Sequence, residues 1–188
     1  MTVGALTRSY PYYTWADYQC WEGAWELIEG VAYAMSPAPS ILHQSISQRI
    51  AQQLGNALEN CAHCQALLPI DWRISEDTVV QPDHLVVCGP LDTPYLSVAP
   101  QLIFEVLSPS TAHKDRTLKF ALYQQEGVKY YVMVDPEAQI AKVFQLTDDG
   151  RLIKRLDAHQ ESYVFTLTED CQIHFDFAHI WPNLLTRD

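Results

Sequence analysis

The chain has 188 residues and a formal net charge of −11, with 23 acidic side chains against 12 Lys and Arg. This length suits one domain, over residues 1–188, whose core needs no disulfide or structural metal. The excess of acid opposes non-specific attraction to a polyanion such as DNA, because that binding draws on clustered Lys and Arg. A bound metal could neutralise part of the acid locally. The basic residues are few but grouped: Lys114, Arg116 and Lys119, then Arg151, Lys154 and Arg155.

Composition also argues against disorder, a membrane span and secretion. Hydrophobic residues at 48% and aromatic residues at 11% favour an ordered globule. No apolar run has the length of a membrane span, and residues 1–13 lack the basic-then-apolar order of a signal peptide. We therefore expect a cytoplasmic protein with no membrane association. In that compartment, five irregularly spaced cysteines indicate reduced thiols: Cys20, Cys61, Cys64, Cys88 and Cys171.

The first third of the chain predicts a short helix, a hairpin and a long helix. Thr14 can cap a helix to about Trp21, and residues 25–28 and 31–35 indicate strands joined at Glu29-Gly30. Residues 36–39, rich in proline, break the sheet. A helix capped by Ser40 follows, with an apolar residue at every fourth position: Leu42, Ile46, Ile50, Leu54 and Leu58.

Strands dominate the middle of the chain. Residues 66–74 and 79–87 predict two strands around a turn at 75–77. Pro82 removes a donor from the second strand, which is therefore bent or at an edge and exposes Asp83. A loop with several prolines leads to a central strand at 102–107, buried on both faces.

The remainder predicts one more helix and a run of strands. The helix extends from about 112 to 126, ends at Gly127 and turns Leu118, Ala121 and Leu122 to the core. This order of elements indicates a mixed α/β (α+β) domain around one central sheet. The expected strands are 129–135, 140–146 and, near the end of the chain, 151–156, 163–167 and 171–175.

The central strand contains a glutamate, Glu105, within an apolar run. A buried carboxylate without a partner costs several kcal/mol or takes up a proton. The natural partner is Asp83, and a divalent cation between the two carboxylates would satisfy both. Waters and the backbone carbonyl of Val106 can complete a site for Mg²⁺ or Mn²⁺. The alternative is that Asp83 is a turn residue and Glu105 pairs with an arginine.

Such a site is suited to one reaction in particular. Magnesium usually keeps several waters and binds substrate phosphates, so the site would best serve hydrolysis of a phosphodiester bond. The spacing of Pro82-Asp83, 21 intervening residues and Glu105-Val106-Leu107 is similar to the PD-(D/E)xK nuclease signature.

More of the chain, from about residue 12 to 145, resembles the Uma-two family of restriction endonucleases. The resemblance implies a restriction-endonuclease-like core with an added N-terminal hairpin and C-terminal strands, a Mg²⁺-dependent site, a DNA substrate and a homodimer. The matching pieces are Trp25 to Gly30, Met35 to Ser40 with His43, Gln81-Pro82-Asp83, Glu105 to Thr111, Asp115 with Lys119 and Tyr123, and Gly127-Val128 with Tyr131 and Val134-Asp135-Pro136.

Carried over by position, the resemblance makes Asp83 and Glu105 the metal ligands. Leu107 stands where the wider signature has the lysine that orients the attacking water and stabilises the transition state. In this family a lysine on the following helix serves instead, and Lys119 matches it. The pair Asp115 and Lys119, at i and i+4, could equally be a solvated surface interaction.

Three accessory residues have open alternatives. Glu26 can supply a third carboxylate or orient a ligand, or can simply pair with a basic residue across strands. His43 can contact a phosphate or position a water, or can be a helix-surface residue. Asp115 accompanies Lys119 in the resemblance.

Other motifs are weaker. The run Cys61-Ala62-His63-Cys64, even with Cys20, lacks the second half of a zinc site. Tryptophans 15, 21 and 25 can stack on bases, or belong to the core or a subunit interface.

From the carboxylates and the resemblance, we expect a metal-dependent DNA endonuclease with Asp83, Glu105 and Lys119 as its catalytic residues. The alternative is an inactive domain that keeps the nuclease fold for binding or dimerisation.

Overall fold

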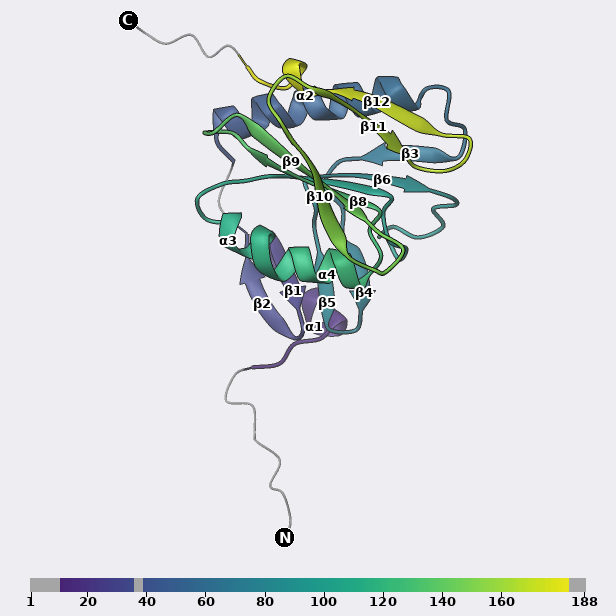
Figure 1. Cartoon of the computed structure of the whole chain (residues 1–188). Helices are drawn as coiled ribbons and strands as arrows, with labels where there is room; N and C mark the ends of the chain where they lie inside the picture. Colours follow the sequence, from purple (N-terminus) through teal and green to yellow (C-terminus); the bar gives the residue numbers. More distant parts are fainter. Residues whose placement is uncertain (1–10, 36–38, 183–188) are drawn as a thin grey trace, which may run out of the picture.

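A six-stranded mixed sheet divides the molecule into two layers (Figure 1). The computed structural model describes residues 11–35 and 39–182. The strand order is β10-β9-β8-β7-β6-β3, in which β7 and β8 are parallel and the other neighbours antiparallel. The strands are β3 (Cys64–Leu67), β6 (His84–Cys88), β7 (Leu102–Val106), β8 (Tyr130–Asp135), β9 (Ile140–Leu146) and β10 (Leu152–Ala158).

A second, four-stranded antiparallel sheet lies on one side of the first, in the order β2-β1-β5-β4 (Figure 1). The predicted hairpin forms its edge as β1 (Trp25–Ile28) and β2 (Val31–Ala34). Glu29 and Gly30 both have positive φ, at 50° and 77°, as the tight turn between twisted strands requires. The strands β4 (Trp72–Ser75) and β5 (Thr78–Val80) complete this sheet.

This second sheet corrects the expectation of a single one. The predicted strand 66–74 is interrupted between β3 and β4, and the predicted strand 79–87 is interrupted at Gln81–Asp83. Because Pro82 cannot donate to a ladder, the chain leaves one sheet at this point and enters the other. Asp83 therefore lies at the junction of the two sheets.

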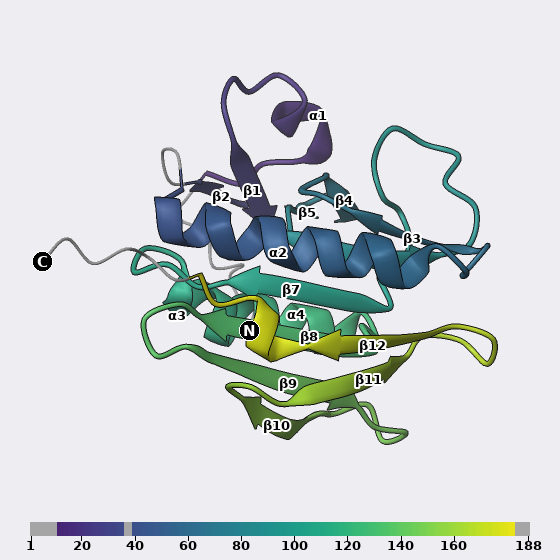
Figure 2. The same ribbon diagram turned by 90° about the horizontal axis from the view of Figure 1, so that it is seen from above.

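The long helix α2 (Ile41–Leu58) covers the opposite face of the large sheet and lies over β7 (Figures 1 and 2). As predicted, Ser40 caps it and accepts a hydrogen bond from the His43 backbone N–H at 3.1 Å. The hairpin of β11 (Ser162–Thr166) and β12 (Gln172–Asp176) packs beside α2. A short 3₁₀ helix, Phe177–His179, follows. This layer is apolar, and its core includes Ile46, Ile50, Leu54, Phe104, Phe165 and Phe175.

The helical segment after β7 lies on the other face, with α3 (Ala112–Lys114), a π-helical turn (Asp115–Lys119) and α4 (Phe120–Gln125) in succession. Its extent agrees with the prediction of 112–126, and Leu122 packs against the core as predicted, but Leu118 and Ala121 do not face the core. Leu118 is 43% exposed and Ala121 is also exposed. The buried side chains are instead Asp115, Lys119 and Tyr123. The segment turns a polar side inward because it faces carboxylates of the sheets.

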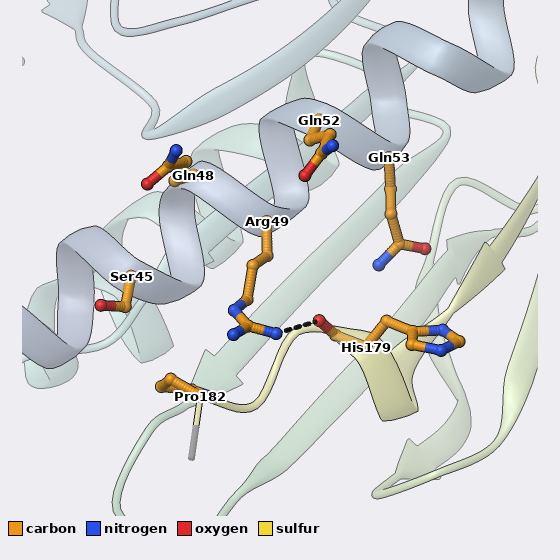
Figure 3. Close-up of a pocket in the computed structure, with 7 residues that line it drawn as sticks. All are labelled: Ser45, Gln48, Arg49, Gln52, Gln53, His179 and Pro182. Carbon is orange, nitrogen blue, oxygen red and sulfur yellow. Dashed lines mark hydrogen bonds between the residues drawn. The ribbon is translucent and has the colours of Figure 1, made fainter. Parts of the chain in front are cut away.

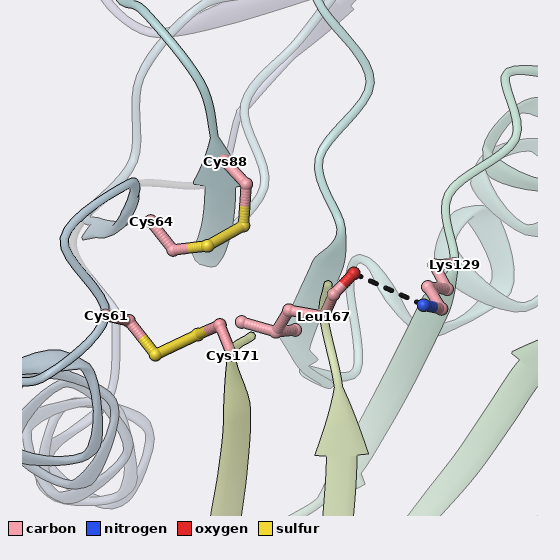
Figure 4. The surroundings of a disulfide bond; sticks show 6 residues. All are labelled: Cys61, Cys64, Cys88, Lys129, Leu167 and Cys171. Atoms are coloured by element: carbon pink, nitrogen blue, oxygen red, sulfur yellow. Dashed lines mark hydrogen bonds between the residues drawn. A yellow bond between two sulfur atoms is a disulfide. The ribbon is translucent and has the colours of Figure 1, made fainter. Parts of the chain in front are cut away.

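The prediction of reduced thiols is wrong for four of the five cysteines (Figure 4). Cys64 and Cys88 lie opposite each other on β3 and β6 and form a disulfide. A second disulfide joins Cys61, after α2, to Cys171, before β12. Cys20 is exposed and unpaired among the described residues. Cys61 and Cys64 each form a disulfide with another cysteine, so the Cys61-to-Cys64 motif is not a zinc site in this structure.

The fold class is as predicted, a mixed sheet with helices on both faces and additional strands at both ends of the chain. The helix predicted from Thr14 to Trp21 is shorter, as α1 (Trp15–Tyr18). The predicted break at residues 36–39 falls mostly outside the described residues. In the described part of the chain, no helix is both long and apolar enough to cross a membrane.

Candidate active site

Asp83 and Glu105 meet where the two sheets join. In the antiparallel pair of β6 and β7, His84 lies opposite Phe104. One further step along this register brings Asp83 opposite Glu105. Asp83 Oδ2 also accepts a hydrogen bond from the Val106 N–H at 2.8 Å. Asp83 is thus held beside this strand by the N–H of Val106, and its predicted partnership with Glu105 through a divalent cation stays a prediction.

Glu105 is 3% exposed and is held by two donors from the following helical segment. Its Oε1 accepts hydrogen bonds from Lys119 Nζ at 2.8 Å and from the Tyr123 hydroxyl at 2.7 Å. No arginine takes part in these bonds. The partner that the sequence left open is thus a lysine with a tyrosine.

Lys119 is shared among three carboxylates. Its Nζ lies 2.8 Å from Glu105 Oε1, 2.8 Å from Glu26 Oε1 and 3.7 Å from Asp115 Oδ1. Lys119 is 3% exposed, so the interpretation of a solvated Asp115–Lys119 pair is wrong. The π-helical turn contains both residues, and such turns occur frequently at functional sites. Lys119 Nζ therefore contacts Glu105 from the helical segment that follows β7.

Glu26 closes the cluster from β1. It is fully buried, forms an ion pair with Lys114, and accepts the Gln81 backbone N–H at 2.9 Å through Oε1. These contacts support the interpretation of Glu26 as a residue that orients others, because it holds the two lysines and the chain just before Asp83.

His43 approaches from the first turn of α2. Its Nε2 lies 3.3 Å from Asp83 Oδ2, so Asp83 is bound on one side by an imidazole and on the other by the Val106 backbone. The six side chains selected from the sequence therefore converge near Val106, whose backbone was the seventh selected group: Asp83, Glu105, Lys119, Glu26, His43 and Asp115.

The carboxylates differ in their protonation. Burial alone would raise the pKa of Glu26, but the charges of Lys119 and Lys114 hold it below its ordinary value. Burial likewise opposes ionisation of Asp83, yet the contacts with His43 and the Val106 N–H keep its pKa low. Both groups are therefore anionic at neutral pH.

Glu105 behaves in the opposite way. Burial raises its pKa to about 8, with the negative charges of Asp115 and Asp83 adding to the effect against the opposing charge of Lys119. Burial also raises the pKa of Asp115. The carboxylates around it raise the pKa of Lys119 well above its usual value, despite burial, so its ammonium stays charged.

These properties fit a divalent cation. Four carboxylates (Glu26, Asp83, Glu105, Asp115) gather near two ammonium groups (Lys114, Lys119), and a cation bound there would take the place of the proton that Glu105 holds at neutral pH. Asp115 Oδ1 has no hydrogen-bond partner among the described residues. Within residues 11–35 and 39–182, no three His, Cys, Asp or Glu side chains are placed so that they could hold a metal ion together, so a cation here would have at most two such side chains as ligands. Oxygen donors with open positions suit Mg²⁺, which keeps waters and uses few protein ligands.

Three contributors to the cluster had no role assigned from the sequence. The Tyr123 hydroxyl donates a hydrogen bond to Glu105, and Lys114 forms an ion pair with Glu26. The backbone N–H of Gln81 donates a hydrogen bond to Glu26. Asp115, Lys119 and Tyr123 are spaced at i, i+4 and i+8, which places them on the same side of a helix. This spacing could have identified Tyr123 as a member of the cluster. Lys114 and Gln81 carried no comparable pattern.

A separate hollow of about 520 Å³ lies elsewhere, between α2 and the chain after β12 (Figure 3). Its lining has no carboxylate, and the Arg49 guanidinium already donates to the His179 carbonyl at 3.1 Å. It therefore lacks the acidic groups of the site above. The lining residues are Ser45, Gln48, Arg49, Gln52, Gln53, His179 and Pro182.

Comparison with known proteins identifies the family and the fold of the chain. The chain matches the Uma2 family, described as "Putative restriction endonuclease", over residues 15–176, further than the resemblance at 12–145. It is 32% identical over 131 residues to the "Uncharacterized protein slr1290" of Synechocystis sp., covering 66% of this chain and 67% of that protein. The crystal structure of "a putative nuclease belonging to DUF820" from Anabaena variabilis shares the fold, with a TM-score of 0.73 and 18% identity over 89% of this chain and 97% of that one. The chain therefore belongs to the Uma2 family of restriction-endonuclease-like proteins.

Proposed function

We propose that this protein is a metal-dependent DNA endonuclease that hydrolyses phosphodiester bonds. The observation that supports this most directly is the 2.8 Å contact of Lys119 with Glu105, within a buried cluster that has more carboxylates than cations. Buried ion pairs are weak stabilisers relative to apolar side chains, so their concentration at one point favours a chemical role.

Asp83 and Glu105 would hold Mg²⁺ or Mn²⁺, with the Val106 carbonyl as a further donor. The ion would supply an activated water and neutralise charge on the scissile phosphate. Lys119 keeps its proton, so it acts as a fixed positive charge and hydrogen-bond donor for the phosphate oxygens. Glu26 holds this ammonium in place, and His43 orients Asp83.

The direct test is nicking of supercoiled plasmid with Mg²⁺ or Mn²⁺ by the wild type and by Glu105→Gln. We expect the variant to be at least about 100-fold slower, the order of loss seen when one transition-state contact is removed. Glu137→Gln changes an exposed glutamate in a turn and is the matched control, with wild-type activity expected. Equal, background-level nicking by the wild type and Glu105→Gln would reject the proposal.

A thermal shift separates the enzyme from an inactive binding module. A cation that binds only the folded protein raises its Tm by mass action. We expect millimolar Mg²⁺ to raise the Tm of the wild type and of Glu137→Gln, and to leave that of Glu105→Gln nearly unchanged. No shift in any of the three proteins, together with no nicking, would favour the inactive module.

The choice of DNA over RNA, the homodimer and the cytoplasmic location belong to the same proposal. The family membership supports a nucleic-acid substrate. Parallel nicking assays on DNA and RNA of the same sequence would test the substrate, and sedimentation equilibrium would test the dimer.

A further inference from the structure

Four aromatic side chains form a row around α1, on the small sheet. Tyr18 and Trp21 have ring centroids 5.5 Å apart, and Trp21 and Trp25 have centroids 5.6 Å apart. Trp15 stacks on Tyr18 at 5.5 Å, with 19° between the ring planes. All four rings are half-buried, so each presents some surface to solvent. With Asp71, Gln81, Gln19 and Gly23 they line a hollow of about 320 Å³.

The hollow also contains hydrogen-bond acceptors. Asp71 Oδ1 accepts from the Tyr18 hydroxyl at 2.7 Å and from Gln81 Nε2 at 2.6 Å. Asp71 Oδ2 and Gln81 Oε1 make no hydrogen bond to any other described residue. Two acceptors in the lining are thus available to a ligand that has N–H donors.

The hollow is joined to the candidate active site through two short connections. Gln81 contributes its side chain to the hollow and its backbone N–H to Glu26. Trp25, which also lines the hollow, precedes Glu26 on β1, and its carbonyl accepts from the Tyr18 hydroxyl at 3.1 Å. Trp25 and Glu26 are consecutive on β1 and point to opposite faces, so a group bound against these rings would be separated from Glu26 by one strand of the small sheet.

We propose that this hollow is a subsite for one unstacked nucleobase of the substrate strand. The inference rests on the proposed nuclease function and concerns which form of nucleic acid the enzyme binds. Every nucleobase has a π-face and at least one N–H donor on its pairing edge, so the rings and the two acceptors suit any of the four. A base can enter only when it is not paired, so the enzyme selects single strands or locally opened duplexes.

The charge of the protein supports this choice of ligand. A net charge of −11 opposes binding through phosphates, whereas base stacking does not depend on an excess of Lys and Arg. Arg73 lies 5.2 Å from the centre of the Trp15 ring, and its charge is shared with the ion pair that it forms with Glu76. An aromatic cage for a quaternary ammonium, which the Asp71 carboxylate would attract by its charge, is the alternative that the binding test has to separate from a nucleobase.

The test measures binding alone, in EDTA, so that no cleavage takes place. Fluorescence anisotropy would compare a labelled single-stranded oligonucleotide with its matched duplex. We expect the wild type to prefer the single strand and Trp21→Leu to weaken that binding at least about fivefold, since stacking contributes roughly 1–3 kcal/mol per base. Trp21→Phe keeps a ring and should retain most of the affinity. Trp181→Leu removes a tryptophan at the far end of the chain and should bind as the wild type does.

Two outcomes would overturn the subsite: equal affinity of the wild type for single strand and duplex, or equal single-strand affinity of wild type and Trp21→Leu. A third outcome would also overturn it, in favour of a cation cage. In that outcome, tetramethylammonium quenches the tryptophan fluorescence and the oligonucleotide does not compete with this quenching. A protein that shows the preference but nicks no plasmid keeps the subsite and rejects the nuclease. A protein that nicks but is insensitive to Trp21→Leu rejects the subsite alone.

Discussion

The two faces of β7 are equally buried and very different in content. On one face, Leu102, Phe104 and Val106 join an apolar cluster with α2 and β12. On the other, Glu105 stands between Ile103 and Leu107 and contacts a lysine and a tyrosine. A single strand thus supports two kinds of interior, one without charge and one with a dense group of ions.

The difference separates stability from function. Burial of each large apolar side chain contributes about 1.5–3 kcal/mol, so the face with Phe104 supports the fold. Buried ions lose their hydration, and well-packed apolar residues in their place are often neutral or stabilising. The buried ions therefore add little to stability beyond the apolar side chains packed around them, such as Ile103 and Leu107, and their presence is explained by the chemistry proposed for them.

The largest expected effect is on activity and comes from Lys119→Met. This change removes the donor to Glu105 and should lower nicking by about 10²–10³-fold. It also leaves Glu26, Glu105 and Asp115 without their shared counter-charge, which should destabilise the fold by about 3–5 kcal/mol. Lys154→Met, at an exposed salt bridge, is the control, and neither quantity should change much. Wild-type nicking by Lys119→Met would contradict the role of this lysine.

Phe165→Ala should have the opposite profile. Phe165 is fully buried in the apolar cluster, and its removal leaves a cavity, so chemical denaturation should show a loss of about 3–5 kcal/mol. Nicking per folded molecule should not change. The neighbouring Val164→Ala, at a side chain that is 43% exposed, should cost far less. A specific loss of activity in folded Phe165→Ala would show that the two faces are coupled.

Opening one disulfide should weaken the apolar layer. The bond between Cys61 and Cys171 closes a long loop, with a sequence separation of 110. The double variant Cys61→Ser/Cys171→Ser should therefore lose about 2–4 kcal/mol of unfolding free energy in urea. Cys20→Ser, at the exposed free thiol, should lose nothing measurable. Equal stability of the double variant and the wild type would show that the loop contributes nothing.

The smallest effect is a dependence on pH that arises on the apolar face itself. Alternation along β6 places His84 on the side of Val86, and its Nε2 has no partner among the described residues. Burial lowers the pKa of His84 to about 4 from an ordinary 6.5. Between pH 6.5 and 4 the unfolded chain takes up a proton that the folded protein refuses, so stability falls as pH falls, by up to about 3 kcal/mol.

Denaturation at several pH values would measure this slope. His84→Leu should be less sensitive to acid than the wild type over the same range, whereas His174→Leu, at an exposed position, should keep the wild-type slope. An unchanged slope in His84→Leu would place the acid sensitivity in other groups.

Much of this protein follows from its sequence. Periodicity located α2 and the hairpin of β1 and β2, and one glutamate in an apolar run identified the strand of the candidate site. These features depend on neighbours close in sequence. The match to known spacing selected Asp83 and Lys119 as partners, and both lie beside Glu105 or its strand.

The tertiary structure decided the rest, because it depends on contacts between distant segments. Spacing could not show that the strands around Pro82 belong to two sheets, or which cysteines pair. The sequence also predicted that Leu118 and Ala121 are on the buried side of their helix, because apolar residues usually face the core. Both are exposed in the structure. The carboxylates of Glu26 and Glu105, brought together from β1 and β7, reverse that preference and draw Lys119 inward.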